Sequence, residues 1–212
     1  MIQNATNRKS RVALVTGAAG AIGAAVVGRL VAEGWKVAGI DLEDAKADLG
    51  LRVDVADRKA MIDAAAQVAD ELGSIELLVT AAGDYEKAPI GEMNVTRWKR
   101  MLDVWLGGTV NACAAAVPQM IEAGFGTVLL LSTDLKAAGK GYTYAAAASG
   151  TVIAFAKSFG CEVAAAGVRV NCLAVRPPVK PDWVAETTNF LANDGQYYAG
   201  QVMFLSSGPQ SK

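Results

Sequence analysis

A glycine-rich segment near the N-terminus carries residues suited to binding a phosphate. The residues TGAAGAIG, Thr16–Gly23, follow a short apolar run and precede a helix-like pattern. Glycines and small residues permit a tight turn, close approach of the backbone to an anion, and close packing of helix on strand. Backbone N–H groups and the positive end of the helix would then face a diphosphate. This pattern predicts a dinucleotide site that includes Gly17, Gly20, Ala21, Ile22 and Gly23.

An acidic residue follows at the spacing that a ribose-binding carboxylate needs. Asp41 ends the next apolar run, about 20 residues after the turn. A carboxylate here accepts hydrogen bonds from both ribose hydroxyls and repels a 2′-phosphate, and the next residues, Leu42, Glu43 and Asp44, include no cation. We therefore predict NAD as the cofactor, NADH preferred over NADPH, and Asp41 and Leu42 as binding residues. The alternative is that Asp41 only caps the helix that follows.

The sequence lacks the residues that several other kinds of catalytic or metal-binding site require. The 212 residues include no histidine, which excludes Ser-His-Asp and Cys-His machinery and histidine-containing zinc sites. Cys113, Cys161 and Cys172 are not spaced like metal ligands, so we expect no metal and interpret all three as buried small hydrophobes of a cytoplasmic protein. A net charge of −1 without a basic patch argues against nucleic acid, and no apolar run has the length of a membrane span.

The elements that would position these residues alternate along the chain. Apolar runs without polar alternation are typical of strands buried on both faces. Such runs cover Arg11–Thr16, Lys36–Ile40, Leu49–Val53, Leu77–Thr80, Thr127–Ser132, Arg169–Ala174 and Gln201–Leu205. Helical patterns, most ending at a glycine, cover Ala21–Glu33, Asp57–Leu72, Thr96–Ala123, Tyr142–Ala166 and Pro181–Asn193. The alternation predicts an α/β, doubly wound parallel sheet in a single domain over residues 1–212.

Several segments, in order, resemble the short-chain dehydrogenase/reductase family. They are TGAAGAIG for the family's glycine turn, VDVAD at Val53–Asp57, LLVTAAG at Leu77–Gly83, GVRVNCLAV at Gly167–Val175, and the C-terminal helix and strand. The resemblance implies a Rossmann-type, three-layer α/β/α fold of about seven strands. It also implies an NAD(P) site to which Asp54, Val55, Ala81, Ala82 and Gly83 contribute.

The resemblance further implies a reaction and an assembly. The reaction is hydride transfer between nicotinamide and a small alcohol or ketone. The assembly is a homodimer or homotetramer built on the two long central helices. A face of small residues, Ala145, Ala148, Val152 and Phe155, would suit close packing between subunits, or else belongs to an ordinary core.

The segments that match the family's active site depart from its Asn, Ser, Tyr and Lys. Thr133, with Ser132 beside it, matches the Ser, and Tyr144 matches the Tyr. Trp105 stands at the Asn position and Ala148 at the Lys position. We predict Tyr144, Thr133 and Ser132 as the catalytic residues. The short PPVKPDW stretch replaces the family's substrate-covering insertion, so we expect an open or unformed substrate pocket.

The missing lysine limits the chemistry. An ordinary phenol, with a pKa near ~10, is protonated at neutral pH, which suits carbonyl reduction better than alcohol oxidation. Lys136, Lys140 or Arg176 could supply the positive charge of the missing lysine. The alternative is that all three are ordinary solvated side chains. Two functions stay open: an NAD(H)-linked oxidoreductase with an eroded active site, or a non-catalytic dinucleotide-binding member acting as sensor, scaffold or subunit partner. A third possibility is a structural oligomer without cofactor.

Overall fold

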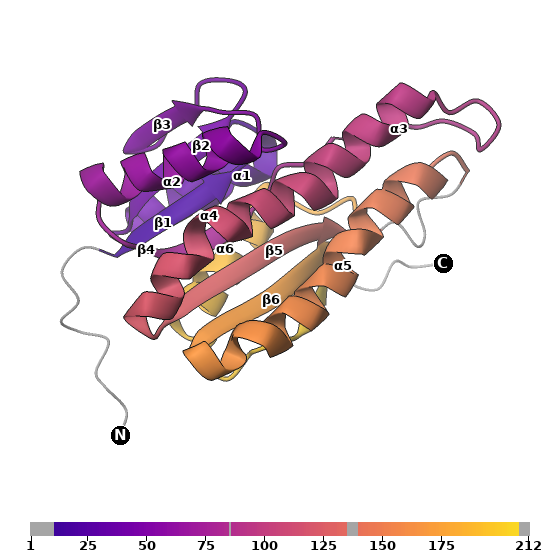
Figure 1. Ribbon diagram of the computed structural model, residues 1–212. Coiled ribbons are helices and arrows are strands. Elements are labelled where there is room, and N and C mark those ends of the chain that lie inside the picture. The colour runs from indigo at the N-terminus through magenta and orange to yellow at the C-terminus, as the bar shows by residue number, and fades with distance from the viewer. Residues whose placement is uncertain (1–10, 85, 135–139, 208–212) are drawn as a thin grey trace.

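The chain folds around a parallel seven-stranded sheet (Figure 1). A computed structural model describes residues 11–84, 86–134 and 140–207. The strand order is β3-β2-β1-β4-β5-β6-β7, and every neighbouring pair is parallel. The strands are β1 (Val12–Thr16), β2 (Lys36–Asp41), β3 (Leu49–Arg52), β4 (Ile75–Thr80), β5 (Gly126–Thr133), β6 (Val168–Val175) and β7 (Val202–Leu205). The chain reverses direction along the sheet after β3, and β1 and β4 flank the crevice that such a reversal opens.

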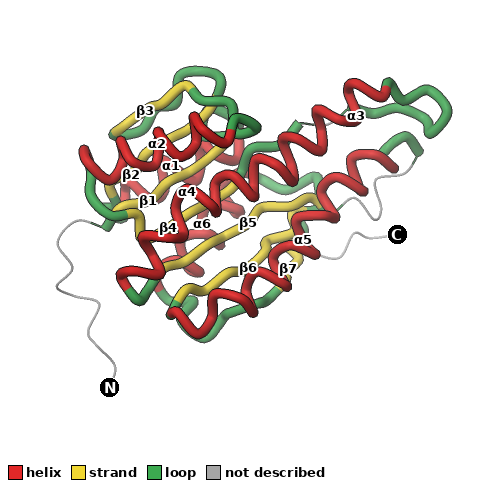
Figure 2. The backbone as a smooth tube through the Cα atoms, viewed as in Figure 1, coloured by secondary structure: helices red, strands yellow, loops and turns green. Residues whose placement is uncertain are grey.

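Helices cover both faces of this sheet, so the predicted three-layer α/β/α fold is confirmed (Figures 1 and 2). One face carries α2 (Arg58–Glu71), α4 (Gly108–Ala123) and α5 (Thr143–Val163), and the other carries α1 (Ala21–Ala32) and α6 (Pro181–Asn193). Alternate residues of each central strand enter different cores: Leu14 packs under the first face, while Ala13 and Val15 pack under the second. Burial on both faces explains the continuous apolar runs.

The predicted element boundaries hold to within two residues, with two exceptions. The helix expected over Tyr142–Ala166 ends as α5 at Val163, and residues Ala164–Ala166 form a 3-10 turn. Three of the glycines expected to end helices, Gly34, Gly124 and Gly167, have φ of 80°, 73° and 80°, the left-handed conformation that favours glycine. The long helix expected over Thr96–Ala123 is instead divided into α3 (Val95–Leu102), a π-helical turn η2 (Asp103–Gly107) and α4. One turn with i→i+5 spacing has no signature in hydrophobic periodicity, which is why the sequence did not reveal it.

One expectation about side-chain burial was wrong, and one open alternative about α5 can be decided. Cys161 is exposed on α5, whereas Cys113 and Cys172 are buried. Burial raises the pKa of both buried thiols to about 12, so they are unreactive at neutral pH. On the same helix, Ala145, Ala148 and Val152 are buried in the chain's own core and Phe155 is partly buried against it, which agrees with the alternative that this face belongs to an ordinary core.

The helix α3 and the first turns of α5 project together beyond the sheet (Figure 1). Trp98 of α3 and Tyr144 of α5 hold them together, with ring centroids 5.3 Å apart. In the part of the chain that the structure describes, no helix combines the length and apolar character that crossing a bilayer requires.

Candidate functional site

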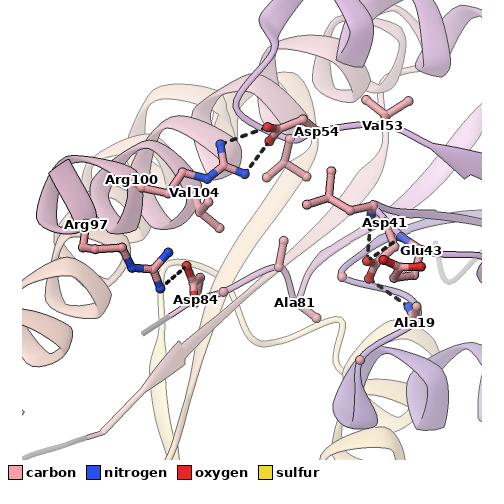
Figure 3. A pocket seen from close by; sticks show the side chains of 16 residues that line it. Ala19, Asp41, Glu43, Val53, Asp54, Ala81, Asp84, Arg97, Arg100 and Val104 are labelled. Carbon is pink, nitrogen blue, oxygen red and sulfur yellow. Dashed lines mark hydrogen bonds and ion pairs between the residues drawn. The ribbon is translucent and has the colours of Figure 1, made fainter. Parts of the chain in front are cut away.

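A cavity of about 620 Å³ lies at the carboxyl ends of β1, β2 and β4 (Figure 3). This volume is in the range of sites that hold organic ligands. Many of the predicted cofactor-binding residues line it: Gly17, Gly20, Asp41, Leu42, Asp54, Val55, Ala81, Ala82 and Gly83. Sequence reasoning missed its other lining residues, which are Ala19, Glu43, Val53, Asp84, Arg97, Arg100 and Val104.

The glycine turn at one end of this cavity is packed without room for side chains. Gly17 has φ of 67°, and a Cβ there would lie 2.6 Å from the backbone of Ala81. A Cβ on Gly23 would lie 2.7 Å from the carbonyl carbon of Gly17 and closer still to its oxygen. Gly23 is not among the residues that line the cavity; it packs directly against the backbone of Gly17 and Ala18. Ala21 does not line it either, and Ile22 lines a second cavity.

The carboxylate of Asp41 connects the end of β2 to this turn. Its Oδ2 accepts a hydrogen bond from the Ala19 N–H at 3.0 Å, and its Oδ1 accepts from the N–H groups of Leu42 at 2.7 Å and Glu43 at 3.2 Å (Figure 3). Residues 42–48, all of which the structure describes, form no helix, so the alternative that Asp41 only caps a following helix is wrong; its carboxylate instead fixes the glycine turn through Ala19. Its side chain remains partly exposed at the cavity wall, so the oxygens can accept further hydrogen bonds.

An arginine from α3 neutralises the second predicted carboxylate. Arg100 contacts both oxygens of Asp54, at 2.9 and 3.1 Å, and Asp54 also accepts from the Ala56 N–H at 2.9 Å (Figure 3). Burial alone would raise the pKa of the Asp54 carboxyl, but hydrogen bonds from Arg100 and Ala56 outweigh it and hold that pKa below its ordinary value of 3.8. Asp54 is therefore ionised at neutral pH and held in one orientation.

Replacing Arg100 by methionine should destabilise the protein only where Asp54 is ionised. Because the folded pKa of Asp54 is lowered, the pair stabilises the fold above pH 3.8, and this is lost as pH falls through the folded pKa. The free energy of unfolding at pH 7, from urea titration, should fall by less than about 1 kcal/mol because the pair is partly exposed. The deficit should shrink towards pH 3, whereas Lys99→Met, an exposed neighbour, should show no such trend. A deficit for Arg100→Met that is independent of pH would contradict this assignment.

A second arginine of α3 fixes the loop that follows β4. Arg97 lies 3.3 Å from Asp84 and 3.0 Å from Glu86, and both Arg97 and Asp84 line the first cavity. The two arginines therefore hold α3 against opposite walls of the cavity, at Asp84 and at Asp54 (Figure 3). Asn111 of α4 fixes the segment that follows Asp54, because its side-chain amide donates to the carbonyls of Val55 and Ala56.

A second, smaller cavity of about 130 Å³ shares Ala81 with the first. Two of the three predicted catalytic residues, Ser132 and Thr133, line it at the end of β5. Trp105 also lines it, so the residue at the position of the family's Asn borders the predicted catalytic hydroxyls. The remaining lining residues are Ile22, Leu131, Val175 and Pro177.

The third predicted catalytic residue, Tyr144, is not among the described residues that line this cavity. It donates its phenolic proton to the Ile90 carbonyl at 2.5 Å. Helix α5 instead presents Ser149 to β5: its Oγ donates to the Thr133 carbonyl at 3.0 Å, and Ser132 donates to the Ser149 carbonyl at 2.8 Å. Ala148, which we matched to the family's lysine, is fully buried.

The proposed substitute cations have different positions. Arg176 is paired with Asp134, the residue that follows β5, and its Nε lies 2.9 Å from Asp134 Oδ2. Arg176 therefore stands close to the end of β5 with its charge balanced. Lys140 is exposed, and Lys136 lies outside the described residues.

The first cavity fits the adenosine and diphosphate of a nicotinamide dinucleotide. The cradle around Gly17 and Gly23 would be filled by any Cβ, so its glycines let the backbone approach an anion closely, and the first turn of α1 is the part that can supply N–H groups to it. The first turn of α1, all of which the structure describes, carries no acidic residue, so nothing there opposes a diphosphate. Asp41 lines the same cavity, and a carboxylate is an acceptor of the kind that ribose hydroxyls require.

Some known proteins are similar to this chain in sequence, and some solved structures are similar to it in fold. The D-threitol dehydrogenase of Mycolicibacterium smegmatis is 34% identical over 179 residues, which cover 77% of this chain and 68% of that protein. The cis-4-hydroxycyclohexanecarboxylate dehydrogenase of Sinomonas cyclohexanicum is 31% identical over an alignment 239 positions long, gaps included, which covers 93% of this chain and 96% of that protein. The ligand-free aldohexose dehydrogenase of Thermoplasma acidophilum shares the fold, with a TM-score of 0.86 at 24% identity over 96% of this chain and 98% of that one.

A family model described as short chain dehydrogenase matches residues 11–189, the part of the chain that contains both cavities. The match agrees with the sheet order, the glycine turn and the relatives above. The chain therefore belongs to the short-chain dehydrogenase family.

Proposed function

We propose that the protein is an NADH-linked reductase of small carbonyl compounds. The observation that carries this proposal is that the two cavities are neighbours: the one lined by the glycine turn and Asp41 shares Ala81 with the one that presents Ser132 and Thr133. Family membership supports it, because short-chain dehydrogenases use nicotinamide dinucleotides and the relatives are dehydrogenases and reductases. NADH is preferred over NADPH because Asp41 and Glu43 would repel a 2′-phosphate at the ribose.

The protein's own residues bind and orient the coenzyme and polarise the carbonyl group of the substrate. The turn at Gly17 and the start of α1 hold the diphosphate, and Asp41 accepts the ribose hydroxyls. When bound, a reduced nicotinamide dinucleotide supplies the hydride. Thr133 donates a hydrogen bond to the carbonyl oxygen of the substrate, since the proton of Ser132 is held by the Ser149 carbonyl. The predicted donor Tyr144 would reach that oxygen only after releasing Ile90, so we assign the polarising role to Thr133.

One observation favours a second candidate, a non-catalytic dinucleotide-binding protein. The face of α5 that meets β5 presents Ser149, and Ala148 is buried, so no lysine of α5 among the described residues lies beside the catalytic hydroxyls. Without a cation there, the site lacks the charge that would stabilise a phenolate base. Binding without turnover would be the outcome of this arrangement.

A NADH titration followed by a carbonyl screen decides between the two functions. We expect saturable binding, and carbonyl-dependent NADH oxidation that Thr133→Val lowers roughly 100-fold, the effect of losing one hydrogen bond to a developing oxyanion. Thr187→Val, on the exposed side of α6, is the matched control and should leave both readouts unchanged. Binding without turnover would favour the non-catalytic candidate. No saturable binding at millimolar NADH would exclude both.

A further inference from the structure

The indole of Trp105 is held rigidly by its position in η2. This five-residue π-helical turn interrupts the helix that carries it, and such turns occur often at functional sites. The Thr109 hydroxyl donates to the Trp105 carbonyl at 2.7 Å, which satisfies a carbonyl that the irregular turn displaces. Trp105 is only 7% exposed. A large side chain thus has one position, fixed at both its backbone and its ring.

The ring lies between the two cavities. Its Nε1 donates to the Asp84 carbonyl at 2.7 Å, and its six-membered ring packs on Gly83, where a Cβ would lie 2.6 Å from Cζ2. Gly83 and Asp84 line the first cavity, whereas Trp105 lines the second. The indole therefore separates the two cavities. One side of the ring contacts Gly83 and Asp84, which line the first cavity, and the other side limits the volume of the second cavity next to Ser132 and Thr133.

The second cavity is small, and the described residues that line it are uncharged. Its volume of about 130 Å³ is well below the roughly 300 Å³ at which pockets begin to enclose drug-sized ligands. Of its lining residues only Ser132 and Thr133 carry hydroxyls, and none of those that the structure describes is charged. Among these described residues, a carboxylate or phosphate on the substrate would lose its hydration without gaining a charged partner.

We propose that Trp105 is the specificity-determining residue of this site and restricts it to small, uncharged aldehydes and ketones. The inference rests on the proposed function and adds the substrate class. In the reaction, the carbonyl carbon gains a hydride, its oxygen gains a proton from water, and NADH is oxidised to NAD. A bulky or charged carbonyl compound is excluded because the indole occupies the space that its substituent would need.

The test compares Trp105→Ala with Trp105→Phe in the full chain. For wild-type protein, kcat/KM over a series of 2-ketones of increasing length should fall as the chain grows. Trp105→Ala should move the optimum to longer ketones, with about a tenfold gain for each added carbon that fits, while Trp105→Phe keeps the wild-type order. Trp183→Ala on α6 removes a partly exposed tryptophan elsewhere and is the matched control. The same order in Trp105→Ala as in wild type would overturn the proposal.

A second readout does not depend on turnover. Acrylamide quenching of bound NADH fluorescence reports how open the nicotinamide end of the site is, and the quenching constant should rise severalfold in Trp105→Ala but not in Trp183→Ala. An unchanged constant would overturn the inference even if no variant turned over. Should Trp105→Ala not fold, Trp105→Leu takes its place in both measurements. If the wild-type protein did not bind NADH, the proposed function itself would be wrong.

Discussion

Gly23→Ala is expected to weaken NADH binding by roughly 100-fold, or about 2.7 kcal/mol. The new methyl group would overlap the carbonyl group of Gly17, whose carbon would lie 2.7 Å from the added Cβ, and neither backbone segment can move without opening the turn. The turn presents the N–H groups that face the diphosphate, so its displacement removes several hydrogen bonds together. The free energy of unfolding should also fall, by about 1–3 kcal/mol, as for other overpacked sites.

Gly28→Ala is the matched control for this substitution. Gly28 lies on the same helix, α1, and a Cβ there meets no other atom within 4 Å. The change should leave NADH binding intact and stabilise the helix by about 0.5–1 kcal/mol. Isothermal titration with NADH and urea denaturation of both variants measure the two effects. If Gly23→Ala bound NADH as tightly as Gly28→Ala, the turn would not be the diphosphate site.

Asp41→Asn is expected to reduce the preference for NADH over NADPH by roughly 10–100-fold. Asparagine keeps the shape of the side chain and one oxygen acceptor, so the hydrogen bond from the Leu42 N–H can persist. It loses the charge-assisted hydrogen bonds to the ribose hydroxyls, which weakens NADH binding. It also loses the repulsion towards a 2′-phosphate, which strengthens NADPH binding.

The control for this prediction is Asp44→Asn, which removes one negative charge three residues away. Asp44 is paired with Arg52 and does not line the first cavity, so the ratio of the two dissociation constants should stay as in wild type. Both coenzymes are titrated by fluorescence against each variant at the same ionic strength. An equal change in ratio for the two variants would mean that overall charge, and not Asp41, sets the preference.

The sequence was most informative where backbone geometry and burial decide the structure. The glycines of Thr16–Gly23 can be identified because only glycine tolerates the positive φ of Gly17 and the contact beneath Gly23. The strands can be identified because burial on both faces leaves few polar residues in them. The position of Asp41 follows from the regular spacing of strand, helix and strand.

The sequence was least informative where the rotation of a helix decides which side chain faces the site. Neighbouring helical residues point about 100° apart, so Ser149 and Ala148 differ completely in what they contact. The rotation of α5 is set by packing of Ala145 and Val152 in the core, which no local pattern around Tyr144 reveals. Arg97 and Arg100 were missed for a similar reason, because only the folded position of α3 brings them to the cavity.

The most direct test of the central claim is a crystal structure of the protein with NADH. We expect the diphosphate against the N–H groups between Gly17 and the start of α1, the adenosine ribose hydroxyls on Asp41, and the nicotinamide end directed past Ala81 towards Thr133. A cavity without coenzyme at millimolar NADH, or a diphosphate bound elsewhere, would contradict the account.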